Sequence, residues 1–237
     1  MDNRITLHKH KEILESILRY LQNEPLSKII GKREFWGMDF ITTKDTLDPR
    51  PDTENLIEHI LELLPRNKPY LFLELGVGTG CIIISLLSEY PDTHALGVDV
   101  SKEALLIAKK NKDLHNMDRL SLRHSSWFDK VNGKYNLIVS NPPYIKSEDI
   151  QNLDENVKNY DPYLALDGGK TGLDPYIEIA KRSKDFLAPQ GLVVVEIGFG
   201  QTQDVSKIFI SQGFTHLHTK KDLSGIDRVL SFSHNLG

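Results

Sequence analysis

From residue 71 onward, short runs of apolar residues alternate with longer stretches in which apolar residues recur every three or four positions. The short runs are typical of buried strands, and the longer spacing is typical of helices packed on one face. The pattern predicts strands at residues 71–75, 95–100, 120–125, 135–140 and 191–198 and helices at residues 81–89, 101–115, 174–187 and 201–212. Strands that alternate with helices imply an α/β fold with a mostly parallel sheet covered on both faces. Residues 215–234 depart from the alternation, because they predict two strands joined by a turn and so an antiparallel hairpin.

The first part of the chain follows a different pattern. Residues 7–22 predict a helix with one apolar stripe, made of Leu7, Leu14, Ile17, Leu18 and Leu21. We expect this helix to pack on the body of the protein, since a surface helix usually turns its apolar face to the core. Residues 23–54 mix short apolar pieces with glycine and proline, which favours a compact connector or hairpin. Thr53 is a candidate cap for a helix at residues 54–64.

Composition narrows the class of protein. The chain has 237 residues, of which 39% are hydrophobic and 26% charged, so it can bury the core of one sizeable domain. The net charge of -4 argues against a stable complex with nucleic acid, because general nucleic-acid binders carry a basic excess. Cys81 is the only cysteine, and neither a signal peptide nor an apolar run long enough for a membrane span is present. We expect a cytoplasmic protein that makes no membrane contact.

A glycine-rich loop follows the first strand of the alternating region. In LELGVGTGC, residues 73–81, Gly76, Gly78 and Gly80 stand between a buried strand and a helix, where glycines let a ligand approach the backbone. Alone, this loop is also compatible with a tight strand–helix turn. Asp99 ends the next strand, 23 residues after Gly76, where a carboxylate can accept both hydroxyls of a ribose. Its alternative role, capping the following helix, is one that Ser101 can fill. Loop and acid together indicate an adenosine-containing ligand.

A second polar motif ends the strand at residues 135–140. Asn141 follows that strand and precedes Pro142, Pro143 and Tyr144. The carboxyl ends of parallel strands meet at one edge of the sheet, so Asn141 should face the same crevice as Gly78. The prolines stiffen the turn, which holds the asparagine oxygen and nearby carbonyls in fixed directions beside a tyrosine. This arrangement suits a planar NH2 group; a strand-terminating turn is the alternative.

This combination resembles the class I S-adenosyl-L-methionine-dependent methyltransferases that act on planar amino groups, and within them the HemK/PrmC family of protein-(glutamine-N5) methyltransferases. The resemblance spans residues 24–230 and includes PRPDTE (49–54), LELGVGTG, GVDVSKEAL (97–105), SSWF (125–128), SNPPYI and YDPYLALDGGKTGLDPY (160–176). It implies a Rossmann-like class I methyltransferase fold: a mostly parallel seven-stranded sheet with a C-terminal antiparallel hairpin. It implies a methyltransferase domain at residues 55–237 and a reduced N-terminal helix with a connector or hairpin at residues 1–54.

The resemblance also assigns roles to residues. It implies that S-adenosylmethionine is held by Gly76, Val77, Gly78, Thr79, Gly80, Asp99, Trp127 and Asn141. It implies that the substrate glutamine is held by Asn141, Pro142, Pro143, Tyr144, Arg50 and Phe35, with Asn141, Pro142 and Tyr144 at the reacting amide. No metal is implied. The implied substrate is the GGQ-bearing domain of a peptide-chain release factor, and we expect a monomer.

The sequence departs from the family pattern at three places, and two alternatives stay open. Ser126 stands where the family often has an acidic residue, and Asp48 stands at a usually apolar position. The family's N-terminal helical domain is reduced to about one helix. The NPPY tetrapeptide is shared with enzymes that methylate the adenine amino group of DNA, which is the first alternative. The second is an inactive module that binds an adenosine ligand.

Three further signals are set aside. GGKTG at residues 168–172 lacks the first glycine of a phosphate-binding loop. His216 and His218 share one face of a strand without a third metal ligand, and we expect both to be solvated. Cys81 is interpreted as a small packed residue behind the glycine loop.

Overall fold

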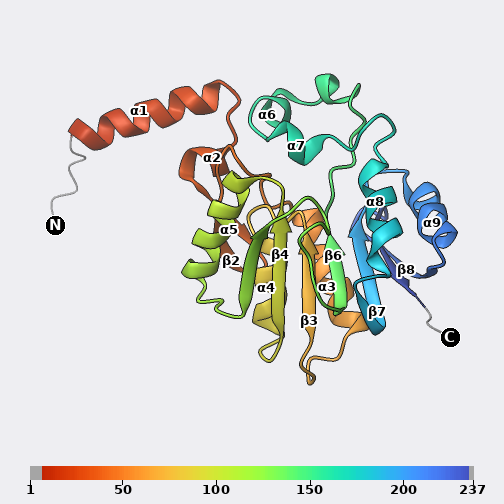
Figure 1. Cartoon of the computed structure of the whole chain (residues 1–237). Helices are drawn as coiled ribbons and strands as arrows, with labels where there is room; N and C mark the ends of the chain where they lie inside the picture. Colours follow the sequence, from red (N-terminus) through yellow and green to blue (C-terminus); the bar gives the residue numbers. More distant parts are fainter. Residues whose placement is uncertain (1–6, 235–237) are drawn as a thin grey trace.

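The computed structural model describes residues 7–234 and contains a central sheet with the strand order β5-β4-β3-β6-β7-β9-β8 (Figure 1). Neighbouring strands from β5 to β7 are parallel, and β9 runs antiparallel to both β7 and β8. The seven strands are β3 (Leu71–Leu75), β4 (His94–Asp99), β5 (Leu120–His124), β6 (Tyr135–Ser140), β7 (Leu187–Glu196), β8 (Thr215–Lys221) and β9 (Asp227–Ser233). The predicted fold, a mostly parallel seven-stranded sheet with an antiparallel C-terminal hairpin, is confirmed.

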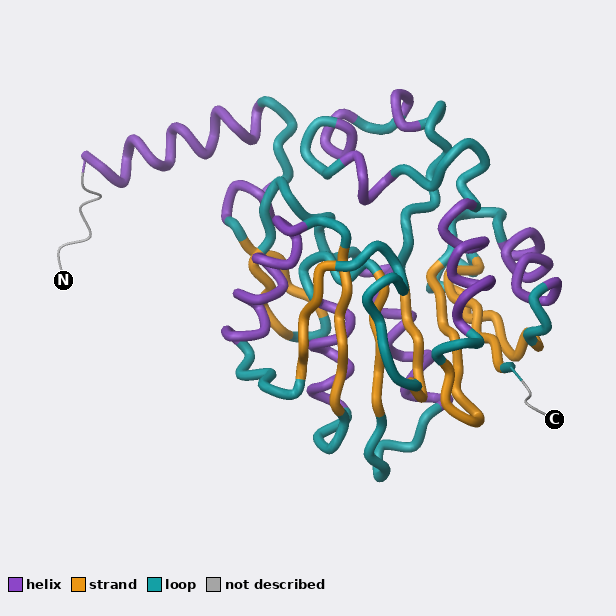
Figure 2. The backbone as a smooth tube through the Cα atoms, viewed as in Figure 1, coloured by secondary structure: helices purple, strands orange, loops and turns teal. Residues whose placement is uncertain are grey.

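Helices cover both faces of the sheet, as Figure 2 shows. Successive residues of a strand point to opposite faces, so Phe72 and Leu73 of β3 belong to two different cores. Phe72 packs with helices α3 (Glu54–Leu63), α4 (Cys81–Glu89) and α5 (Lys102–Leu114). Leu73 packs with helices α8 (Asp174–Ser183) and α9 (Thr202–Ser211). These two apolar layers explain why the strands are apolar on both sides.

The strand order reverses at the centre of the sheet. β3 pairs with β4 on one side and with β6 on the other, and the chain reaches β6 only after crossing back from β5. Such a switch point leaves a crevice outside the carboxyl ends of the strands, where α/β proteins bind ligands. The loops that follow β3, β4 and β6 therefore start from the same edge.

Two elements differ in length from the prediction. α8 ends at Ser183 and β7 already begins at Leu187, whereas the sequence pattern predicted a helix to residue 187 and a strand from residue 191. A bulge explains the difference, because Tyr135 pairs with Leu187 while Leu137 pairs with Leu192. The bulged residues of β7 include a proline and a glycine, which hide the first part of the strand from an apolar pattern.

The N-terminal segment comprises helix α1 (Leu7–Leu21), a short helix α2 (Leu26–Ile30) and a hairpin of β1 (Lys32–Phe35) and β2 (Met38–Ile41). The predicted hairpin is present. Phe35 and Phe40 are fully buried and meet edge-on, with ring centroids 6.2 Å apart, in the core beneath α3 and α4. The hairpin is thus part of the main core.

The prediction that α1 packs on the body is wrong. α1 extends away from the sheet in Figure 1, and Leu14, Ile17, Leu18 and Leu21 are 59%, 48%, 60% and 71% exposed. The side chain of Leu7 lies outside the described ones. Periodicity measures how apolar residues are distributed around a helix and carries no information on what covers them. At the end of α1, Arg19 pairs with Glu24, and just beyond the helix the Tyr160 hydroxyl donates to the Gln22 carbonyl.

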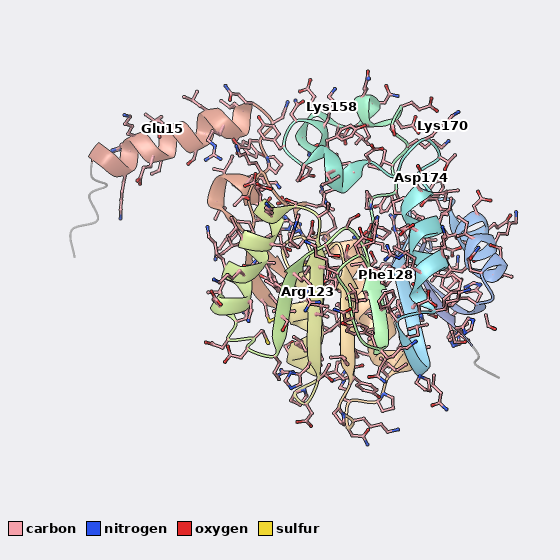
Figure 3. The ribbon with its side chains drawn as sticks, in the orientation of Figure 1. Glu15, Arg123, Phe128, Lys158, Lys170 and Asp174 are labelled. Atoms are coloured by element: carbon pink, nitrogen blue, oxygen red, sulfur yellow. The ribbon has the colours of Figure 1, made fainter. Side chains whose placement is uncertain are left out.

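Between β6 and α8 the chain makes an excursion over the carboxyl edge of the sheet. It contains the 3-10 turn η2 (Ile150–Asn152) and the short helices α6 (Glu155–Lys158) and α7 (Tyr163–Leu166). In Figure 3, Lys158 and Lys170 lie on this excursion and Asp174 stands at the start of α8. A parallel bridge between Ile145 and Asp167 closes the base of the excursion. No helix within residues 7–234 is long and apolar enough to cross a membrane.

Candidate functional site

A cavity of about 540 Å³ opens at the carboxyl edge of β3, β4 and β6. Its walls come from the loops after these strands, from residues 45–50 and from the excursion at residues 162–169. The cavity therefore occupies the crevice that the strand reversal creates.

The glycine loop forms the floor of the cavity. Gly76 and Gly78 have φ angles of +72° and +52°, and a Cβ built on either would meet no atom within 4 Å. Both glycines line the cavity, so their backbone faces open space. The loop is fixed from below, because the backbone N–H groups of Gly76 and Val77 donate to the Val98 carbonyl at 2.9 and 3.0 Å.

Gly80 has a different position from the other two glycines. A Cβ on Gly80 would lie 3.1 Å from Cδ1 of Ile84, and Gly80 is not among the described residues that line the cavity. Its positive φ of +80° turns the chain into α4. The structure therefore places this glycine at the helix entry and brings Val77 and Thr79 to the cavity.

Asp99 lines the cavity beside the glycine loop. Its Oδ2 accepts from the Gly78 N–H at 2.9 Å, and its Oδ1 accepts from the Ser101 N–H at 2.8 Å. Burial raises the pKa of Asp99, while these backbone donors lower it. Ser101 caps α5 by accepting from the Ala104 N–H at 3.0 Å, as the sequence suggested. Asp99 is thus free of capping, and its oxygens keep acceptor capacity for a ligand.

Glu74 also lines the cavity, and the sequence prediction missed it. The side chain is buried in β3, and its Oε2 accepts from the Ile83 N–H at 3.2 Å. Burial, together with the charge of Asp99, raises the pKa of Glu74 well above its usual value. The available signal was a charged residue inside the apolar run of residues 71–75, since such residues are rarely buried without a role.

Trp127 reaches the cavity from the loop after β5. Its backbone has a φ of +42°, which is uncommon for a residue with a side chain. Ser125 holds this turn, because its hydroxyl donates to the Trp127 carbonyl and accepts from the Lys130 N–H, both at 3.0 Å. The Ser125 N–H in turn donates to the Asp99 carbonyl at 2.9 Å. Trp127 and Asp99 are therefore coupled through one short hydrogen-bonded path.

Asn141 lines the cavity at the end of β6, together with Pro143. Its Nδ2 donates to Oγ1 of Thr53 at 3.1 Å. Pro142 and Tyr144 are not among the described residues that line the cavity. Pro142 is buried, and Tyr144 packs against the sheet core, where burial raises its pKa to about 12. The Tyr144 carbonyl accepts from Nε2 of Gln201 at 3.1 Å, which holds the turn from outside.

Thr53 does not have the role that the sequence predicted. It occupies the cap position of α3, but its side chain makes no capping hydrogen bond, and its backbone is helical with φ -69° and ψ -18°. The preceding 3-10 turn η1 (Pro51–Thr53) already carries the chain into the helix. The Thr53 hydroxyl is bonded instead to Asn141.

Arg50 lines the cavity and is part of a buried ion cluster, which also contains Lys28, Asp48 and Asp161. Nζ of Lys28 lies 3.2 Å from Asp48 and 3.1 Å from Asp161, and Arg50 lies 2.7 Å from Asp161. Nζ also donates to the Thr43 and Thr46 carbonyls. Asp48 is therefore the buried partner of a lysine, which explains a charge at this position.

Phe35 is placed elsewhere, since its buried ring packs against Phe40 and does not line the cavity.

Within residues 7–234, no group of three or more His, Cys, Asp or Glu side chains could hold a metal ion. Cys81 is buried at the start of α4, where it also lines the cavity, and burial raises its pKa to about 12. Ser126 lines the cavity beside Trp127.

Comparisons with known proteins point to one family. The family model of the methyltransferase small domain matches residues 45–169. The release factor glutamine methyltransferase of Agrobacterium fabrum is 44% identical over 236 residues, covering 98% of this chain and 82% of that protein. A bifunctional methyltransferase of Rickettsia typhi is 41% identical over 244 residues. The match covers 94% of this chain but only 47% of that protein. A solved methyltransferase structure from Pyrococcus furiosus, 18% identical with a TM-score of 0.62, covers 92% of this chain and 97% of that one and has the same fold.

Proposed function

Since this chain belongs to the release factor glutamine methyltransferase family, we propose that it methylates the side-chain amide nitrogen of a glutamine in a peptide-chain release factor. The target we propose is the glutamine of the GGQ motif, and the methyl donor is S-adenosylmethionine. The observation that carries the proposal is that Asn141 lines the same cavity as Gly78 and Asp99. A fixed amide acceptor thus stands beside a pocket suited to an adenosine-containing ligand.

The residues of the cavity fit S-adenosylmethionine. Open space above Gly76 and Gly78 leaves room for the methionine part against the backbone. The buried Asp99 carboxylate retains acceptor capacity for the two ribose hydroxyls, and Trp127 would lie beside the adenine. When bound, the cofactor supplies a methyl group on a positively charged sulfur, which is already activated for displacement.

The chain's own contribution is to orient the substrate amide. An amide nitrogen is a weak nucleophile because its lone pair is delocalised into the carbonyl. The Asn141 side-chain oxygen and the Pro142 carbonyl would each accept one N–H, which aims the nitrogen and stabilises the positive charge that develops on it. Pro142 and Pro143 fix φ at both positions, so these acceptors need no reorganisation during the reaction.

The substrate side of the cavity is the second part of the proposal. Arg50 lines the cavity and is held by Asp161, so its position is set before a substrate binds. Tyr144 would support the turn through its ring, which packs against the core, and through its carbonyl, which Gln201 holds. We assign Arg50 to the shape of the substrate entrance and Tyr144 to the stiffness of the turn at Asn141.

Transfer of a labelled methyl group tests the proposed function. The protein is incubated with labelled S-adenosylmethionine and one of three acceptors: a release factor, the same factor with its GGQ motif changed to GGA, or double-stranded DNA. We expect label on the GGQ protein alone. Equal label on the GGA protein would contradict a glutamine target, and label on the DNA would favour an adenine amino group as the substrate.

A further inference from the structure

Two buried polar side chains, Thr53 and Glu196, lie close to the Asn141 amide. Asn141 follows β6 and Glu196 ends β7, and these two strands pair in register up to Ser140 and Val195. Thr53 approaches from the start of α3. Thr53 and Glu196 are only 2% and 3% exposed, so both polar groups must find partners inside the protein.

One hydrogen bond and the electrostatics around Glu196 give these groups a direction. Nδ2 of Asn141 donates to Oγ1 of Thr53 at 3.1 Å, so the Thr53 oxygen is used as an acceptor. The hydroxyl proton is then free to be donated, and it is not spent on capping α3. Hydrogen bonding from Thr53 and Asn141 stabilises the ionised form of Glu196, which places the carboxylate at the accepting end. Asn141 therefore donates to Thr53, and both side chains act as donors toward the Glu196 carboxylate.

We propose that Thr53 and Glu196 are positioning residues that fix the direction of the Asn141 side-chain amide. With its NH2 group committed to Thr53, Asn141 presents its oxygen to the cavity. A substrate NH2 group requires an acceptor there. If the Asn141 amide were turned the other way, its own NH2 group would face the substrate NH2 group, and two donors would meet. This role rests on the proposed function, because only an amino or amide substrate requires an acceptor at this point.

The ionisation state of Glu196 determines which way the Asn141 side-chain amide points. Burial raises the pKa of Glu196 to about 7, and Arg228 lowers it while Asp52 raises it. Its Oε2 has no hydrogen-bond partner within the described residues, which adds to the cost of keeping the carboxylate charged. Once protonated, the carboxyl group becomes a donor to Thr53, and the Thr53 hydroxyl turns toward the Asn141 oxygen. The Asn141 NH2 group would then face the cavity.

The groups around Glu196 do not replace it as the titrating group. Arg228 and Asp52 form an ion pair at 3.0 Å. Burial raises the pKa of Tyr144 and of Cys81 to about 12, and it raises the pKa of Tyr176 well above its usual value. Glu74 lines the cavity together with Asn141 and has a raised pKa, so the test must separate its titration from that of Glu196.

The experiment uses Glu196→Gln, which keeps the shape and supplies a permanent donor, and Thr53→Val, which removes the hydroxyl. Thr53→Ser is the matched control because it retains the hydroxyl. We expect kcat/KM for the GGQ-containing release factor to fall on the order of 10- to 100-fold in the first two variants, the loss of one oriented hydrogen bond. Thr53→Ser should retain the wild-type value. Affinity for S-adenosylhomocysteine, measured by calorimetry, should change less than about twofold in all three.

A second readout needs no substrate. The side-chain amide signals of Asn141 in 15N-labelled protein, assigned by their loss in Asn141→Ala, should shift with a midpoint near pH 7 in the wild type. In Glu196→Gln that step should be absent, whereas any titration of Glu74 should remain. Wild-type activity in Glu196→Gln, or an Asn141 signal that titrates in the same way without Glu196, would overturn the proposal. If the wild type methylated no release factor, the proposed function would fail, while the amide signal would still report on the positioning role.

Discussion

Replacing Lys28 by methionine removes the central cation of the buried ion cluster. Nζ of Lys28 contacts Asp48 at 3.2 Å and Asp161 at 3.1 Å, and all three side chains are less than 10% exposed. Without it, Asp161 still pairs with Arg50, which is itself 43% exposed, whereas Asp48 keeps only hydroxyl donors. Removing one partner of a buried ion pair typically costs about 3–5 kcal/mol, because a charge stays buried without compensation. We expect the free energy of unfolding to fall by about this amount.

A matched lysine on the hairpin supplies the control. Lys32 pairs with Asp39 at 2.6 Å, a shorter contact than either carboxylate contact of Lys28, but both side chains are more than half exposed. Exposed pairs are worth under about 1 kcal/mol, so Lys32→Met should change stability little. The measurement is urea denaturation of both variants and the wild type, followed by fluorescence. An equal loss of unfolding free energy in the two variants would refute the reasoning, because burial would then make no difference to what an ion pair contributes.

The pH dependence of the Lys28→Met loss gives an independent check. Burial raises the pKa of Asp161 in the wild type, and the charges of Lys28 and Arg50 lower it. Removing Lys28 moves the folded-state pKa further above the unfolded value. A carboxyl group with a raised folded-state pKa destabilises the protein fully above that pKa, and this penalty disappears as the pH falls toward the unfolded value. The free energy of unfolding that Lys28→Met loses should therefore be largest at neutral pH and should decrease as the pH is lowered.

Three other outcomes test the site. Asn141→Ala should abolish methyl transfer while largely sparing S-adenosylhomocysteine binding by calorimetry; lost cofactor affinity with intact substrate binding would show that its role is misplaced. Gly78→Ala should cost about 1 kcal/mol in urea denaturation because of its φ of +52°, and it should weaken S-adenosylhomocysteine binding because the added methyl points into open cavity space; unchanged affinity would contradict the position of the ligand. Cys81 should resist iodoacetamide at about pH 8 in the folded protein and react in urea, since burial raises its pKa to about 12; prompt alkylation without urea would argue against a packed thiol.

The mostly parallel sheet and the edge that carries the site could be predicted because the strands have local sequence signals. Apolar runs and helical periodicity can be recognised in the sequence whatever the packing, and Gly78, Asp99 and Asn141 each lie at or shortly after the end of an apolar run. Their convergence on one cavity follows from the parallel order alone. The prediction of these positions required no knowledge of side-chain contacts.

The parts that could not be predicted depend on contacts distant in sequence. The apolar stripe of α1 predicted the helix correctly but not its exposure to solvent, because periodicity does not show which surface the stripe packs against. Thr53 had the sequence context of a cap, yet its hydroxyl is bonded to Asn141, 88 residues further along the chain. Glu74 and Glu196 interrupt apolar runs, and that interruption was the only local sign that either side chain is buried for a reason.

One buried side chain ties the N-terminal hairpin to the ligand loop. The Asn111 amide on α5 accepts from the Ile41 N–H at 2.7 Å and donates to the Ile41 and Thr79 carbonyls, both at 2.9 Å. Pulling either segment away strands a buried polar group at a cost of about 1–3 kcal/mol. The hairpin and the floor of the cavity therefore share one opening equilibrium. Amide hydrogen exchange at Ile41 should therefore report how firmly the glycine loop is held.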